Sequence, residues 1–173
     1  ITKGQILLKN INPKHLLTEL KVLKKKGCYI KVSENSILLK SMKKHKAIKI
    51  ETGPFPKYAT DNMPMALALL TKTPGTSFIS EKIFSNRFMA VPELNRIGAK
   101  ITIENNNATV VGQKNLYGAD CISSDLRTTF SIILGALAAK GTSKIHRIYH
   151  GLRGYDGLER KLKSLGVLIK SKN

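Results

Sequence analysis

Alternating apolar and polar positions follow a helical pattern at three places along the chain, and a glycine separates the two patterns each time. The alternating segments cover residues 28–32, 99–103 and 167–170, and the glycines before them are Gly27, Gly98 and Gly166. Glycine readily adopts the left-handed conformation that ends a helix, and alternation with a period of two is typical of a half-buried strand. Each place is therefore predicted to hold a helix, a glycine cap and a strand.

A second glycine opens an earlier strand at each place. These glycines are Gly4, Gly75 and Gly141, and the closing glycine follows 23, 23 and 25 residues later. Near-equal spacing of the same sequence of elements predicts an internal repeat. Asn-containing stretches at 34–36 and 105–107 are typical of hairpin turns between strands.

The second and third copies share an additional first half. Asp61 and the apolar run 66–70 correspond to Asp125 and the apolar run 134–139. A full unit is thus strand, turn, helix, glycine, strand, helix, glycine, strand. The first copy starts directly at its second strand, so we expect the missing first half to precede Ile1 or to come from another chain. A sheet edge and apolar surface should then be uncovered.

These units predict an α/β fold with pseudo-threefold repeats, the first of them incomplete. The length of 173 residues predicts a single domain, residues 1–173. No apolar run approaches the roughly 20 residues of a membrane span, so we expect no membrane association. Neither the two cysteines nor the four histidines have metal-ligand spacing, so we expect no metal and no cofactor, and a reducing cytoplasm as the location.

The net charge of +19 suggests polyanionic partners. The cations are mostly lysines scattered along the chain without interleaved aromatic residues, which is typical of a solvated surface rather than of a nucleic-acid site. The arginines are more informative. Arg87, Arg127 and Arg153 are predicted at helix N-termini, where a cation is unfavourable by about 0.3–1 kcal/mol unless an anion offsets it. An anion site is one interpretation, and pairing with the neighbouring Asp125 and Asp156 is the other.

The stretch 52–61 is predicted to be a rigid turn that leads into a helix. Gly53, Pro54 and Pro56 restrict its path. Asp61 at its end is either a helix N-cap or a group that takes a proton from a substrate hydroxyl.

Seven motifs occur in one order that closely resembles the enolpyruvyl transferase family, specifically the C-terminal half of UDP-N-acetylglucosamine 1-carboxyvinyltransferase. They are Thr60–Asp61, IFSNRFM (83–89), VPEL (91–94), RIGA (96–99), SDLR (124–127), RIYH (147–150) and RGY (153–155). The resemblance implies an inside-out α/β barrel domain. It also implies transfer of the enolpyruvyl group of phosphoenolpyruvate to the 3-hydroxyl of UDP-N-acetylglucosamine in peptidoglycan biosynthesis.

The resemblance also implies roles for individual residues. Asp61 would deprotonate the sugar hydroxyl, and the backbone at Ile83 would contact the sugar nucleotide. Arg127 and Arg153 would bind the carboxylate or phosphate of phosphoenolpyruvate, and Asp125 and Arg87 would support them. The family's proton-donating loop cysteine lies in the N-terminal half, so we expect this chain to be inactive without that half as a partner.

Two positions depart from the family pattern. Ser85 stands where the family usually has Glu, and Leu152 stands where it usually has Asp. A non-catalytic domain that binds an anion or a partner protein is therefore an alternative. A basic nucleic-acid-binding domain is a further alternative, which only the net charge favours.

Overall fold

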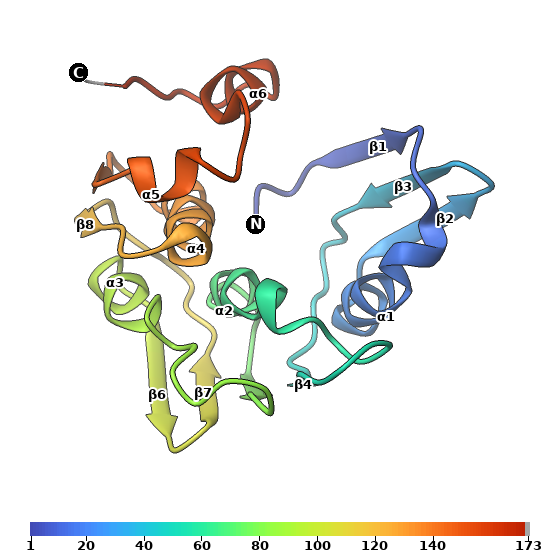
Figure 1. The fold of residues 1–173 in the computed structure, drawn as a ribbon, viewed down its shortest axis with the longest axis horizontal. Coiled ribbons are helices and arrows are strands. Elements are labelled where there is room, and N and C mark those ends of the chain that lie inside the picture. Colours follow the sequence, from blue (N-terminus) through green and yellow to red (C-terminus); the bar gives the residue numbers. More distant parts are fainter. Residues whose placement is uncertain (172–173) are drawn as a thin grey trace.

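The first repeat unit is a three-stranded antiparallel sheet with one helix (Figure 1). The computed structural model describes residues 1–171. This unit contains β1 (Gln5–Lys9), the short 3₁₀ helix η1 (Pro13–Leu16), α1 (Leu17–Lys26), β2 (Tyr29–Ser33) and β3 (Ser36–Lys40), with sheet order β1-β3-β2. Gly27 has a φ of 105° and its N–H donates to the end of α1, which confirms the predicted cap.

The second unit is the most complete and holds the main core. It contains β4 (Lys49–Glu51), the 3₁₀ turn η2 (Thr60–Asn62), α2 (Met63–Leu70), β5 (Thr76–Ser80), α3 (Val91–Arg96), β6 (Lys100–Glu104) and β7 (Asn107–Val111). Its sheet order is β4-β5-β7-β6, with β4 and β5 parallel and the other pairs antiparallel. Six of the eight residues of α2 are buried, because apolar side chains lie all around this helix.

The third unit repeats the parallel strand pair of the second. It contains β8 (Asp120–Ile122), α4 (Leu126–Ala138), β9 (Lys144–His146), α5 (Tyr149–Leu152) and α6 (Leu158–Ser164), with β8 parallel to β9. Helix α4 packs against α2, and Ser131 Oγ donates a buried hydrogen bond of 2.6 Å to the carbonyl of Pro64. The two helices that follow the first strands of units two and three thus lie side by side.

Both predicted hairpins are confirmed, and so is the predicted repeat except for the last strand of the third unit. The turn between β2 and β3 lies at residues 34–35, and the turn between β6 and β7 lies at residues 105–106. Within the described chain, β1 pairs only with β3, whereas its counterpart β5 pairs on both sides. Ile6, Leu7 and Leu8 of β1 are exposed, as expected for an uncovered sheet edge.

The strand predicted at 167–170 is wrong for this structure, because these residues form no ladder. The counterpart β6 pairs only with β7, the return strand of its hairpin. No described strand takes the place of β7 in the third unit, so residues 167–170 have no strand to pair with, and the N–H of Val167 donates instead to the Leu162 carbonyl at the end of α6 (3.1 Å).

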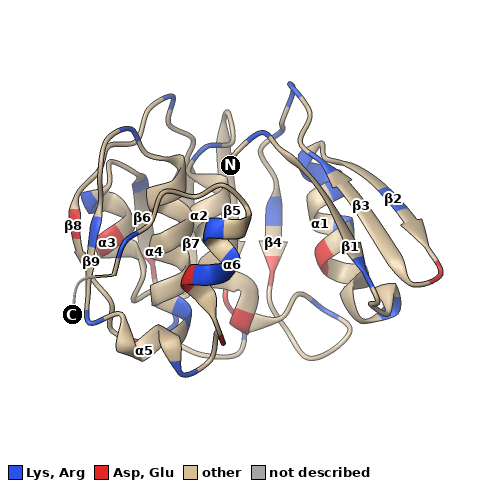
Figure 2. Cartoon of the chain, turned by 90° about the horizontal axis from the view of Figure 1, so that it is seen from above, with Lys and Arg blue, Asp and Glu red and all other residues tan. Residues whose placement is uncertain are grey.

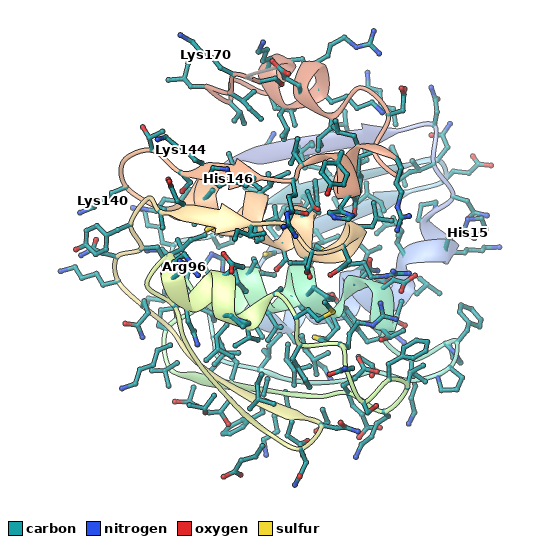
Figure 3. All side chains as sticks on the ribbon, turned by 60° about the vertical axis from the view of Figure 1, so that its left-hand side comes forward. His15, Arg96, Lys140, Lys144, His146 and Lys170 are labelled. Atoms are coloured by element: carbon teal, nitrogen blue, oxygen red, sulfur yellow. The ribbon has the colours of Figure 1, made fainter. Side chains whose placement is uncertain are left out.

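Basic side chains are distributed over most elements and do not collect on a single one (Figure 2). Figure 3 labels basic residues from different parts of the chain, including His15, Arg96, Lys144 and Lys170, at separate places on the molecule. Among residues 1–171, no helix is long and apolar enough to cross a bilayer. The same part of the chain contains no cluster of three or more His, Cys, Asp or Glu side chains suited to a metal ion.

Candidate functional site

Asp61 lies in η2 and joins two arginines from distant parts of the chain. Its Oδ1 accepts a hydrogen bond of 2.6 Å from Arg127 Nε and lies 3.5 Å from Arg87 Nη2. The hydrogen bond from Arg127 lowers the pKa of the Asp61 carboxyl. No side chain caps η2 or α2. The interpretation of Asp61 as a helix cap is therefore wrong, and its carboxylate is ionised and faces the arginines.

Asp125 is the N-cap of α4, as predicted. Its carboxylate accepts hydrogen bonds from the backbone N–H groups of Arg127 (2.8 Å) and Thr128 (3.0 Å). Burial opposes ionisation of Asp125, but the hydrogen bonds from Thr128, Arg127 and Ser124 prevail and lower its pKa. The backbone around Asp125 thus fixes the start of α4 and the base of the Arg127 side chain.

Arg87 lies in the loop between β5 and α3. Its guanidinium stacks over the ring of Phe84, 4.5 Å from the ring centroid, and its side chain is only 16% exposed. The helix N-terminus predicted at Arg87 is wrong, because α3 begins at Val91. Pro92 in its first turn favours that start, since proline has no N–H to leave unpaired there.

Arg153 is not at the start of the last helix, which begins at Leu158. It instead follows α5 and is exposed, and the structure shows no ion pair for it within residues 1–171. Gly154 packs tightly against the side chain of Leu126 in the first turn of α4. The structure therefore brings together Asp61, Arg87 and Arg127, and holds the 153–155 turn beside the same end of α4.

Glu81 is a buried residue of this region that the sequence analysis did not identify. It follows β5 directly, and its carboxylate accepts hydrogen bonds from Thr60 Oγ1 (2.9 Å) and from the N–H groups of Ile83 (2.8 Å) and Phe84 (3.1 Å). A signal was present in the sequence, since a carboxylate ends the alternating strand TSFIS just before the IFSNRFM motif.

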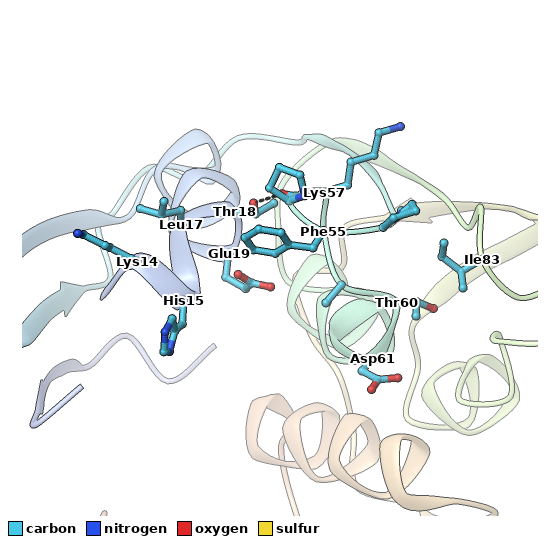
Figure 4. Close-up of a pocket in the computed structure, with 14 residues that line it drawn as sticks. Lys14, His15, Leu17, Thr18, Glu19, Phe55, Lys57, Thr60, Asp61 and Ile83 are labelled. Atoms are coloured by element: carbon cyan, nitrogen blue, oxygen red, sulfur yellow. Dashed lines mark hydrogen bonds between the residues drawn. The ribbon is translucent and has the colours of Figure 1, made fainter. Parts of the chain in front are cut away.

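A pocket of about 350 Å³ opens between α1 and the loop that leads to Asp61 (Figure 4). Asp61 and Ile83 line it, together with Lys14, His15 and Phe55. The 53–57 loop is closed at its base. There the Gly53 N–H donates to the Tyr58 carbonyl at 3.2 Å, and Thr52 forms an isolated parallel β-bridge with Tyr58. Asp61 thus sits at the rim of a hollow that is large enough for a sugar.

The chain matches one known family of proteins over most of its length. A family model described as EPSP synthase (3-phosphoshikimate 1-carboxyvinyltransferase) matches residues 1–162. The chain belongs to this family. Its fold class is therefore the inside-out α/β type of the enolpyruvyl transferases, as the sequence resemblance implied.

Within the family, the chain is similar to curated proteins named UDP-N-acetylglucosamine 1-carboxyvinyltransferase. It is 46% identical over 173 residues to the protein of Pelagibacter ubique and 46% identical over 170 residues to that of Campylobacter lari. The alignments cover 100% and 98% of this chain, but only 42% and 41% of those relatives. The chain thus spans about two fifths of their length.

Solved structures confirm the fold. The enolpyruvyl transferase NikO from Streptomyces tendae superposes with a TM-score of 0.87 at 22% identity, over 96% of this chain and 40% of NikO. EPSP synthase from Acinetobacter baumannii superposes with a TM-score of 0.69 at 16% identity, over 99% of this chain and 40% of the enzyme.

Proposed function

We propose that residues 1–173 form the C-terminal domain of a UDP-N-acetylglucosamine 1-carboxyvinyltransferase. The reaction would transfer the enolpyruvyl group of phosphoenolpyruvate to the sugar 3-hydroxyl, in the cytoplasm, as a step of peptidoglycan biosynthesis. The observation that carries the proposal is the contact of Asp61 with Arg127 and Arg87, since three separate segments converge on one carboxylate. The 46% identity to enzymes of that name supports the choice of substrates.

Asp61 is the proposed proton acceptor. Its lowered pKa keeps it ionised at neutral pH, so it can accept a hydrogen bond from the sugar 3-hydroxyl and then take its proton. The arginine contacts also make it a weak base. An anionic group of phosphoenolpyruvate that draws Arg127 away would strengthen Asp61 as a base at the moment when both substrates are bound.

Arg127, Arg87 and Arg153 are the proposed ligands of the carboxylate and phosphate of phosphoenolpyruvate. Arg127 projects from the first turn of α4, where the helix dipole also favours an anion. Asp125 supports this end of the site by capping α4. Arg153 is exposed and has no partner that would compete with a ligand among the described contacts.

The role proposed for Ile83 can be made more specific. Its backbone N–H already donates to Glu81. Contact with the sugar nucleotide therefore falls to its carbonyl oxygen, which would accept a hydrogen bond.

The proposed chemistry is addition followed by elimination. The 3-hydroxyl oxygen bonds to C2 of phosphoenolpyruvate as a proton adds to C3, and phosphate then leaves as a proton is removed from C3. Positive charge from the arginines and from the start of α4 would stabilise the anionic groups throughout. The proton donor to C3 is assigned to the N-terminal half, where the family resemblance places the loop cysteine. Cys121 of this chain is fully buried, and burial raises the pKa of its thiol to about 11, which makes it unsuited to this role.

The test is phosphate release from phosphoenolpyruvate and UDP-N-acetylglucosamine. We expect none from residues 1–173 alone, and turnover when an N-terminal half of the family is supplied as a second chain. Asp61→Ala should reduce that turnover at least about 100-fold, which is the scale of a lost general base. Glu159→Ala is a matched control, because it removes another carboxylate paired with a cation, here Lys163 at 2.6 Å. Turnover by the isolated chain, or equal turnover of both variants, would contradict the proposal.

Leu152 favours a second candidate, a domain that binds an anion without catalysis. This side chain is 50% exposed beside Arg153 and offers no carboxylate to orient the guanidinium. Binding of phosphoenolpyruvate without turnover in the two-chain assay would identify this function.

A further inference from the structure

We propose that Glu81 is a positioning residue for the transfer reaction, and that its buried carboxylate fixes Asp61 relative to Arg87. The inference rests on the proposed function of Asp61. Glu81 itself would not touch either substrate, since it lies behind the two segments that do.

The environment of Glu81 is unusual for a carboxylate. The side chain has no exposed surface, and within residues 1–171 the structure shows no cation within 4.0 Å of it. A buried carboxylate is costly unless hydrogen bonds replace its water. Here three donors do so, a hydroxyl on one oxygen and two backbone N–H groups on the other. Glu81 therefore has a defined orientation with both oxygens engaged.

The two oxygens reach two different parts of the site. Oε2 holds the hydroxyl of Thr60, the residue immediately before Asp61. Oε1 holds the N–H of Phe84, whose ring lies against the Arg87 guanidinium.

These contacts link Asp61, through Thr60, Glu81 and Phe84, to Arg87. The contact between Asp61 and Arg87 at 3.5 Å closes the chain of contacts into a ring. The ring joins η2 to the 83–87 loop, two segments that no strand pairing connects. Small displacements of either segment would change the position of the base relative to the arginine.

The N–H of Ile83 is the third donor to Glu81. The same carboxylate therefore also orients the peptide whose carbonyl we assign to the sugar nucleotide. The buried Glu81 carboxylate thus fixes the positions of the proposed base, of one arginine and of one substrate contact. Displacements of about 1 Å at such groups can cost about 100-fold in rate.

The first experiment compares Glu81→Leu with Glu81→Gln. Leucine has a similar volume and accepts no hydrogen bond. The amide of glutamine can still accept from Ile83 and Phe84, and can donate to Thr60. In the two-chain assay we expect Glu81→Leu to lower kcat about 10- to 100-fold with a smaller change in KM for phosphoenolpyruvate, and Glu81→Gln to restore most of kcat.

A second pair of variants, at Thr60, tests the same contact if Glu81→Leu does not fold. Thr60→Val removes only the hydroxyl that donates to Glu81, and Thr60→Ser retains it. We expect Thr60→Val to lower kcat about tenfold and Thr60→Ser to restore it.

Amide hydrogen exchange in the 1–173 chain supplies a readout that is independent of catalysis. The N–H groups of Ile83 and Phe84 should exchange faster in Glu81→Leu than in Glu81→Gln. Two results would overturn the positioning role and leave the proposed function intact. One is faster amide exchange in Glu81→Leu with an unchanged kcat. The other is a kcat of Thr60→Ser as low as that of Thr60→Val. An inactive wild-type assembly would instead refute the proposed function.

Discussion

Removing the carboxylate of Asp61 should strengthen binding of phosphoenolpyruvate, even though it lowers turnover at least about 100-fold. In the structure Asp61 occupies Arg127 at 2.6 Å and Arg87 at 3.5 Å. Any anionic ligand of these arginines must first displace it. Asp61→Ala removes this internal competitor.

The size of the effect follows from the exposure of the pair. The side chains of Asp61 and Arg127 are 57% and 34% exposed, so solvent screens their attraction. Ion pairs of this kind contribute about 0.2–1 kcal/mol. Loss of the competitor should therefore lower the Kd for phosphoenolpyruvate by a factor of about 1.4 to 5, at 1.4 kcal/mol per tenfold change.

The assay is a titration of phosphoenolpyruvate followed through the Nε–H resonance of Arg127, because this group donates directly to Asp61. Glu159→Ala is the control for net charge, since it makes the same change of charge at α6. Binding to Asp61→Ala that is no tighter than binding to Glu159→Ala would refute the competition between the carboxylate and the ligand.

Two further predictions concern the elements that support the site. Asp125→Ala should lower the free energy of unfolding by about 0.5–2 kcal/mol through loss of the α4 cap. Because the pKa of Asp125 is lowered in the folded state, the difference in unfolding free energy between wild type and variant should be complete above the unfolded-state pKa and should disappear as the pH falls through the folded-state pKa. Chemical denaturation at several pH values would measure it. A constant difference across that range would contradict this origin. Ser131→Ala should cost about 0.5–1.5 kcal/mol in thermal or chemical unfolding, because the buried hydrogen bond from α4 to the Pro64 carbonyl is lost. Ser164→Ala, on an exposed hydrogen bond, should cost less than about 0.5 kcal/mol. Equal losses in the two serine variants would show that the bond between α4 and α2 contributes nothing.

Features of the fold with a local cause could be predicted from the sequence. The position of β1 and the two hairpin turns agree with expectation, because alternation and turn residues act within a few positions. The strand expected at 167–170 required a pairing partner that its own pattern cannot reveal. The helix N-terminus expected at Arg87 lies at Val91 instead, because Pro92 favours the first turn of a helix.

The candidate site was predictable as a set of residues but not as a geometry. The repeat showed that Asp61 and Asp125 are equivalent positions, and the family resemblance selected the arginines. Neither showed that Asp61 contacts Arg127 across 66 positions of sequence rather than capping a helix. Glu81 was missed because the burial of a strand-end carboxylate depends on how η2 packs over it, which is a tertiary property.

The closed base of the 53–57 loop makes this segment a suitable place for a built-in sensor. Because Gly53 and Tyr58 fasten its two ends, added residues need not displace Asp61. Each doubling of loop length costs only about 0.6 kcal/mol in closure entropy. A short insertion that carries an environment-sensitive fluorophore would sit at the mouth of the pocket beside Phe55. Such a variant would report occupancy of the pocket optically, and would allow inhibitors to be screened without any enzymatic turnover.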